Sequence, residues 1–228
     1  MKLLLTNDDG IDAPGIAALR QAALPLGQIV VAAPADAQSG CSHRVTTNGP
    51  LRVGIGEPDR YTVHGTPADC VRLALHRLAP DFDWVLSGIN AGGNLGADVH
   101  HSGTVAAVRE AVLHGRPGVA LSHYLKRGLT VDWQRAATWV TPILRDLLAQ
   151  PWTPGVFWNI NLPHRTPDEP DPEVVYCRLD RGPLPLSFRL EEEHHYYDGN
   201  YHQRRREPGA DVDVCFSGKI AVTRLTLF

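Results

Sequence analysis

The stretch KLLLTNDDGIDAPG, residues 2–15, contains an apolar run that ends in two adjacent carboxylates. Residues 3–6 are typical of a strand buried on both faces, and Asp8 and Asp9 follow it closely. Because like charges repel, neither aspartate stays ionised at low cost beside a buried strand unless a cation lies between them. The other interpretation is a turn made by Asn-Asp-Asp-Gly, in which Asp12 caps the helix that follows.

Apolar periodicity beyond this stretch predicts an α/β fold with a mostly parallel sheet. Residues 14–23 have helical spacing, and residues 29–34 form a second buried strand after a short connection. A strand, helix, strand order with short connections favours parallel pairing. The alternation continues with helices over residues 67–78, 102–114 and 131–149, and strands over residues 84–86, 118–122 and 156–161.

Two parts of the chain depart from this alternation. Short β-like runs predict a small β excursion from the main sheet, at residues 44–47, 51–55 and 60–64. A later stretch rich in prolines and charged blocks is typical of an extended arm or hairpin rather than of a core. We therefore expect a core over residues 1–163, an arm used in oligomerisation over residues 164–210, and a closing segment, 211–228, that returns to the core or to a partner subunit.

The charge balance and the spacing of the cysteines restrict the class of ligand and the cellular compartment that we expect. With 22 basic and 25 acidic residues, the 228-residue chain has a formal net charge of −3. This balance provides no global field that attracts nucleic acid, which favours a small anionic ligand held by a local site. The four cysteines form no CxxC pair and no compact disulfide spacing, which fits a reducing compartment. Three leucines near the N-terminus are too few for a signal peptide or a membrane span, so we expect a cytoplasmic protein.

Polar loops follow three of the predicted strands, at residues 7–12, 38–42 and 87–94. Because ligands of open α/β sheets bind beyond the carboxyl ends of the strands, these loops are expected to share one edge. They offer hard oxygen donors, namely the side chains of Asp8, Asp9, Ser39 and Asn90. Mg²⁺ or Mn²⁺ matches such donors better than Zn²⁺ or copper. Taken singly, Ser39 and Asn90 are typical of loop hydrogen bonding, and their joint placement favours a site.

Glycines and a helix start predict a phosphate site next to these donors. Gly92, Gly93 and Gly96 allow the backbone to approach a ligand closely. The helix that opens at Ser102-Gly103-Thr104 presents free N–H groups and a positive dipole end, which suits a phosphate. A Ser/Thr helix cap is the other interpretation of these residues, and both can hold together.

Five motifs occur in the order and spacing of one protein family. They are TNDDGIDAPGIAAL (6–19), VAAPADAQSG (31–40), GTPADCV (65–71), SGINAGGNLGADV (87–99) and SGTVAAVREA (102–111). In these motifs the chain resembles the SurE (survival protein E) family of metal-dependent nucleotidases, densely over residues 1–122 and more thinly afterwards. The resemblance implies a Rossmann-like core with helices on both faces of the sheet. It also implies one divalent ion per subunit, Mg²⁺ or Mn²⁺, and hydrolysis of nucleoside 5'- and 3'-monophosphates to nucleoside and phosphate.

The resemblance further implies roles for single residues. The metal ligands of the family fall on Asp8, Asp9, Ser39 and Asn90, and the two aspartates are the expected catalytic residues. The phosphate-contacting positions fall on Asn94, Ser102, Gly103 and Thr104. A metal fixed by the aspartates neutralises phosphoryl charge and lowers the pKa of a bound water, which we favour as nucleophile over an aspartate. The family usually has a tyrosine before Ser-Gly-Thr, whereas this chain has His100 and His101, candidates for a general acid or for packing histidines.

A self-association surface is expected in the arm. Residues 165–208 carry too many prolines and charges to bury themselves, yet they contain more apolar and aromatic side chains than a disordered tail usually has, among them Leu184, Leu186, Phe188, Leu190, Tyr196, Tyr197 and Tyr201. Such a segment becomes ordered by wrapping a neighbour, with the aromatics as anchors. The resemblance likewise implies dimers or tetramers with exchanged C-terminal elements. A surface loop folded on its own subunit is the other interpretation.

Two other functions fit the residues less well. A calcium-dependent nucleoside hydrolase also begins with an acidic strand end, but it needs a DxDxGxDD pattern that NDDGID lacks. A nucleotide-binding regulatory protein without hydrolysis would not need an intact set of metal ligands. We therefore expect an enzyme, a phosphoric monoester hydrolase.

Overall fold

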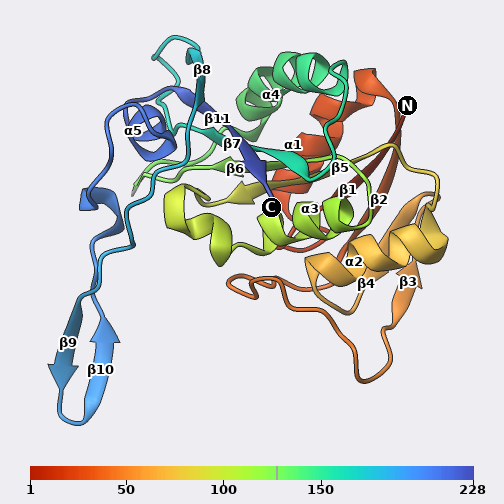
Figure 1. The fold of residues 1–228 in the computed structure, drawn as a ribbon, viewed down its shortest axis with the longest axis horizontal. Coiled ribbons are helices and arrows are strands. Elements are labelled where there is room, and N and C mark those ends of the chain that lie inside the picture. The colour runs from red at the N-terminus through yellow and green to blue at the C-terminus, as the bar shows by residue number, and fades with distance from the viewer. Residues whose placement is uncertain (127) are drawn as a thin grey trace.

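The computed structural model describes residues 1–126 and 128–228, and one large sheet forms its centre (Figure 1). Within those residues the sheet has nine strands, in the order β3-β4-β2-β1-β5-β6-β7-β11-β8. The strands are β1 (Lys2–Thr6), β2 (Gln28–Pro34), β3 (Val53–Ile55), β4 (Arg60–Val63), β5 (Trp84–Ala91), β6 (Gly118–His123), β7 (Val156–Leu162), β8 (Val174–Cys177) and β11 (Ile220–Thr226). A separate hairpin contains β9 (Phe188–Glu191) and β10 (His194–Tyr197). The helices are α1 (Pro14–Ala23), α2 (Pro67–Leu73), α3 (Gly103–Leu113), α4 (Trp133–Leu148) and α5 (Asp211–Phe216).

The pairing of the strands confirms the predicted α/β class with a mostly parallel sheet. β1 pairs in parallel with β2 on one side and with β5 on the other. The parallel pairing continues from β5 through β6 to β7. β11 then runs antiparallel to β7 and parallel to β8.

Side chains of the central strand point alternately into two apolar layers. Leu3 and Leu5 pack in a core with Ile16 of α1 and Leu144 of α4. Leu4 faces the other way, into a core formed with α2 and α3. Figure 1 shows these two pairs of helices on opposite faces of the sheet. Because both faces are covered, the three central residues of β1, Leu3 to Leu5, are all apolar, as the sequence predicts.

The order in which the chain adds strands to the sheet reverses at β1. From β1 the chain passes through α1 to β2 and β4 on one side, and it later returns to β5 on the other side of β1. Such a switch leaves a crevice at the carboxyl ends of the strands, where ligands of this fold class bind. Asp8 and Asp9 follow β1, and Asn90 lies near the end of β5, so both walls of the crevice carry predicted site residues.

Three local predictions differ from the structure. The β3–β4 pair is not a separate excursion, because β4 pairs in parallel with β2 and extends the main sheet. Residues 44–47 form no strand. Asp12 does not cap α1, since Ala13 is the residue at that cap and the Asp12 carboxylate lies 2.5 Å from the Arg60 guanidinium. The helix begins one residue later than the capping interpretation requires, so the cap position falls on a residue whose side chain cannot accept a hydrogen bond.

The predicted arm contains two different structures. β8 lies at the edge of the main sheet, paired with β11. The β9–β10 hairpin instead projects away from the body of the molecule (Figure 1). In the closing segment α5 and β11 pack on this same chain, although the boundaries at residues 163 and 210 stay a prediction. Within the described residues, no helix is both long and apolar enough to cross a membrane.

Gly15 lets α1 begin in contact with the end of β5. A Cβ atom at this position would lie 1.9 Å from the backbone oxygen of Ile89. Real Cβ contacts are never this short, and the obstacle is backbone rather than a side chain that can rotate away. Glycine therefore sets the distance between α1 and the strand that carries Asn90.

We expect Gly15→Ala to lower stability, although alanine is the better helix former by about 1 kcal/mol. The added methyl group forces α1 away from β5, and overpacking of this kind costs up to about 3 kcal/mol. Thermal unfolding should show a Tm lowered by a few degrees. Gly56→Ala is the matched control, because a Cβ there meets nothing within 4 Å. Equal Tm values for Gly15→Ala and the native protein would contradict this account.

Candidate active site

One cavity at the carboxyl edge of the sheet brings most of the predicted site residues together. Its volume is about 360 Å³, and it is lined from β5 and from the loops after β1, β2 and β5. The predicted residues that line it are Asp8, Asp9, Ser39, Asn90, Asn94 and Ser102. Gly103 and Thr104 form the first turn of α3 directly after Ser102.

Asp8 is a buried carboxylate. It is 5% exposed, and Thr104 Oγ1 donates a hydrogen bond to its Oδ1 atom. Burial raises the pKa of Asp8 to about 6, against the hydrogen bond from Thr104 and with a further contribution from the charge of Asp9. The ionised form of Asp8 is therefore destabilised by its surroundings.

Asp9 links the two central strands. The backbone N–H of Ala91, at the end of β5, donates to Asp9 Oδ2 over 2.9 Å. Burial raises the pKa of Asp9 as well. Among the residues that the structure describes, none forms an ion pair with Asp8 or Asp9. Two adjacent, partly desolvated carboxylates thus lack a protein cation.

Ser39 and Asn90 complete the set of oxygen donors. The loop of Ser39 is tied to the end of β1, because Gln38 N–H donates to the backbone oxygen of Asp8 over 2.7 Å. Asn90 donates its Nδ2 to the backbone oxygen of Gly92 over 2.7 Å, so its amide oxygen remains available as a ligand. Both side chains line the same cavity as the aspartates.

This donor set fits a hard divalent cation. It combines two carboxylates with a hydroxyl and an amide oxygen, the ligand types that Mg²⁺ and Mn²⁺ accept. Across residues 1–126 and 128–228, no three His, Cys, Asp or Glu side chains gather as a metal-binding group, so softer-metal chemistry has no built site there. The carboxylate pair without a cationic partner is the observation that favours a metal.

The first turn of α3 is built around Asp8. Ser102 caps the helix, and its Oγ accepts a hydrogen bond from Val105 N–H over 3.0 Å. A Cβ atom on Gly103 would lie 2.9 Å from Cys41 Sγ and 3.0 Å from Asp8 Oδ2. Within the described chain the N–H of Gly103 donates to no protein acceptor. Glycine therefore brings the positive end of α3 against the carboxylate pair.

Two cavity residues come from the distant arm and were not predicted as site residues. Leu184 and Tyr201 line the cavity, and their predicted role as anchors for oligomerisation stays a prediction. Tyr201 donates its hydroxyl to Asp98 Oδ2 over 2.6 Å, and the Arg204 guanidinium stacks 4.4 Å above the Tyr201 ring. No local pattern identifies Leu184 and Tyr201 as site residues, because both lie far from the motifs in the sequence. Asp98 lies inside a motif, so its place near the site could have been inferred from the sequence.

The two histidines that are candidates for a general acid, His100 and His101, have different positions relative to the cavity. His101 lines the cavity and is exposed to solvent, so it can reach a bound ligand. His100 is exposed and does not line the cavity; its backbone oxygen accepts a hydrogen bond from Ser42 Oγ over 2.9 Å.

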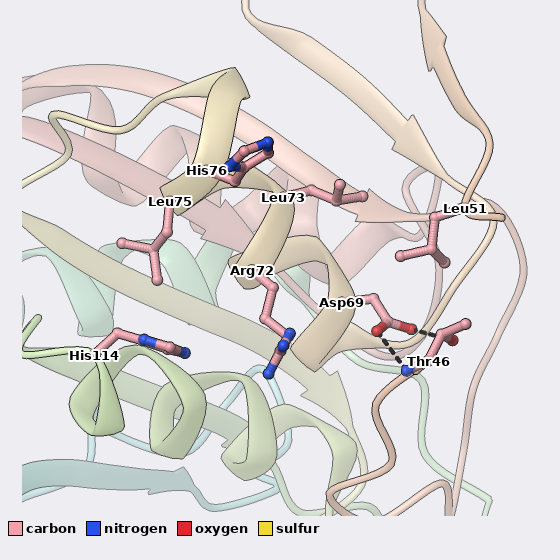
Figure 2. Close-up of a pocket in the computed structure, with 8 residues that line it drawn as sticks. All are labelled: Thr46, Leu51, Asp69, Arg72, Leu73, Leu75, His76 and His114. Atoms are coloured by element: carbon pink, nitrogen blue, oxygen red, sulfur yellow. Dashed lines mark hydrogen bonds between the residues drawn. The ribbon is translucent and has the colours of Figure 1, made fainter. Parts of the chain in front are cut away.

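A larger cavity of about 450 Å³ lies between α2 and α3, away from all these residues (Figure 2). Leucines line it, and its charged groups already have partners. Figure 2 shows Asp69 bonded to Thr46, and Arg72 donates to Glu110 over 3.0 Å. The smaller cavity at the strand ends is therefore the better candidate for chemistry.

Comparisons with known proteins agree with this geometry. The model of the family described as Survival protein SurE matches residues 3–183. A relative from Nostoc sp. is 53% identical over 225 residues, which cover 99% of each chain. The protein named 5'-nucleotidase SurE 1 of Thermus thermophilus is 45% identical over 237 residues, covering 100% of this chain and 92% of the relative. The crystal structure of a SurE protein from Aquifex aeolicus superposes with a TM-score of 0.89 at 32% identity, covering 100% of this chain and 94% of that one. The fold, the assembled donor set and these matches lead to one conclusion: the chain belongs to the SurE family.

Proposed function

We propose that this chain is a metal-dependent 5'-nucleotidase, which hydrolyses nucleoside 5'-monophosphates, and also 3'-monophosphates, to nucleoside and phosphate. The observation that carries the proposal is the carboxylate pair of Asp8 and Asp9, which has no ion-pair partner among residues 1–126 and 128–228 and whose Asp8 lies against the first turn of α3. Relatives named 5'-nucleotidase support it. The four cysteines are free thiols, which supports a cytoplasmic location.

In this proposal Asp8, Asp9, Ser39 and Asn90 hold one Mg²⁺ or Mn²⁺ ion. The ion supplies positive charge next to the phosphoryl oxygens and lowers the pKa of a water molecule. Water is the nucleophile, because both aspartates are occupied as ligands.

The remaining residues bind and orient the phosphoryl group. The N–H of Gly103 and the dipole of α3 face the developing negative charge, and the hydroxyl of Ser102 can donate from the same turn. Thr104 orients the Asp8 carboxylate through its hydroxyl. Asn94 completes the phosphate site, and His101 is placed to protonate the leaving oxygen.

Phosphate release from 5'-AMP tests this function. The protein is stripped with EDTA and assayed with and without added Mn²⁺. Phosphate release that depends on Mn²⁺ supports the proposal. Release of free base without phosphate would indicate glycosidic cleavage instead, and nucleotide binding without turnover would indicate a regulatory protein.

Asp9→Asn should lower turnover by about a hundredfold to a thousandfold or more, since it weakens the charge that holds the ion. In EDTA the same variant should unfold at an equal or higher Tm than the native protein, because a buried like charge beside Asp8 has been removed. The metal-dependent mechanism would be refuted if Asp9→Asn, assayed in EDTA, hydrolysed 5'-AMP at the rate of the native protein.

Gly103→Val should weaken both phosphate binding and turnover by more than about tenfold. The valine side chain would meet Asp8 and Cys41 at distances near 3 Å and push the start of α3 away from the carboxylates. Inhibition by inorganic phosphate measures binding, and Gly56→Val is the control in open space. Equal inhibition constants for Gly103→Val and the native protein would show that the helix start is only a cap.

A homo-oligomer, dimer or tetramer, is part of the same proposal. The hairpin exposes Phe188 (54%), Leu190 (63%) and Tyr197 (53%) on one face and Tyr196 (43%) on the other, and Leu186 (88%) lies just before it. An exposed patch of this kind on a projecting element is typical of an interface. A second copy of the chain is the occupant that the family resemblance implies.

Light scattering should therefore give a mass of at least twice the 25.0 kDa of one chain. Leu190→Asp should shift the mass toward a single chain, because it places a charge inside the interface. Ile55→Asp, at a residue of β3 that is 76% exposed, should leave the mass unchanged. A native protein that stays at 25.0 kDa as its concentration rises would exclude the oligomer.

A further inference from the structure

The loop at Asn94 is held by side chains rather than by regular secondary structure. Asn94 N–H donates to Asn161 Oδ1 over 2.8 Å. The next N–H group, of Leu95, donates to Asp98 Oδ2 over 3.1 Å, and the N–H of Gly96 donates to Asp211 Oδ2 over 2.8 Å. Three consecutive N–H groups of the loop are thus held by side-chain oxygens.

Two asparagines of β7 bind the peptide group of Asn94 most closely. Asn161 also donates its Nδ2 to the backbone oxygen of Asn94 over 3.0 Å, so one amide side chain binds both the N–H and the C=O. Asn159 donates its Nδ2 to that oxygen over 2.9 Å. Both asparagines are 0% exposed, and their spacing of two places them on one face of the strand.

The side chain of Asn94 is anchored to the neighbouring strand. Its Nδ2 donates to Ser122 Oγ over 2.7 Å, and Ser122 of β6 stands opposite Asn161 of β7 in the sheet. The backbone and the side chain of Asn94 are therefore fixed to adjacent positions of two parallel strands. Asn94 itself is 7% exposed and lines the candidate active site.

This arrangement is not optimal for stability. Asn159 Oδ1 is buried and accepts no hydrogen bond from any residue that the structure describes. A buried acceptor without a partner destabilises the folded state, whereas an apolar side chain with the same branching would leave no acceptor unpaired at this position. The presence of the Asn159 amide is therefore explained by the hydrogen bond that its Nδ2 donates to the backbone oxygen of Asn94.

We propose that Asn159, Asn161 and Ser122 are positioning residues for phosphate binding. They fix Asn94 so that the second hydrogen of its Nδ2 can be donated to the phosphoryl group, and this inference rests on the proposed function. In the described chain the side chains of these three residues make no hydrogen bond to Asp8, Asp9, Ser39 or Asn90, and Ser122 meets Asn90 as its partner in the pairing of β5 with β6. The positioning network therefore acts on phosphate and leaves the metal ligands in place.

The test uses Asn159→Leu in the full-length protein. We expect an unchanged or higher Tm, with the KM for 5'-AMP and the inhibition constant of inorganic phosphate both raised about threefold to tenfold. Affinity for Mn²⁺, measured by calorimetry without nucleotide, should stay at the native value. Thr223→Val is the matched control: Thr223 is 1% exposed and pairs with Asn159 in the sheet, but it does not contact the loop.

Ser122→Ala provides a second variant with little change in volume. It removes the hydrogen bond that holds the Asn94 side chain. The KM for 5'-AMP and the inhibition constant of inorganic phosphate should both rise, again with native Mn²⁺ affinity. Native phosphate inhibition in both variants would overturn the inference, as would a loss of Mn²⁺ affinity equal to the loss for phosphate. Inactivity of the native protein with Mn²⁺ and 5'-AMP would instead count against the proposed function, so the two failures are distinguishable.

Discussion

The repulsion between Asp8 and Asp9 is the constraint around which the rest of the site is organised. Both carboxylates follow a strand whose leucines are fully buried, and within the described chain neither meets a basic side chain. Thr104 and the N-terminal end of α3, together with the Ala91 N–H at the end of β5, offer partial compensation from two elements. Those elements reach the aspartates because β1 is central, with parallel neighbours on both sides. A cation bound by the same carboxylates would neutralise the negative charge that the protein dipoles leave uncompensated.

Local patterns predicted the parts of the fold that depend on neighbours in sequence. The buried leucines of β1, the amphipathic spacing of α1 and the cap at Ser102 all appear where their residues indicated. The meeting of Ser39 and Asn90 with the aspartates followed from a general property of parallel sheets, whose carboxyl ends share an edge.

Other features depend on contacts that no local pattern encodes. β4 looked like part of an excursion because its alternation says nothing about its partner, and pairing with β2 became visible only in the structure. Tyr201 was predicted as an oligomer anchor because an aromatic residue in a polar segment looks unpartnered. Its partner, Asp98, is 103 positions earlier in the chain. Asn159 and Asn161 were part of a recognisable stretch, but only the hydrogen bonds to Asn94 give them a role.

The contact between Tyr201 and Asp98 is one of several that join the arm to the wall of the cavity, because Arg204 also donates to Asp98 and to the backbone oxygen of Leu95. Tyr201 follows the projecting hairpin by a few residues, and its hydroxyl also lies close to the glycine-rich loop, since a Cβ atom on Gly93 would be 3.3 Å from it. In the proposed oligomer, a partner that orders the hairpin through these contacts would change the affinity of the cavity for ligand, and a ligand would change the association of the copies by the same factor. The apparent affinity for ligand would then depend on protein concentration, and ligand would shift the association equilibrium.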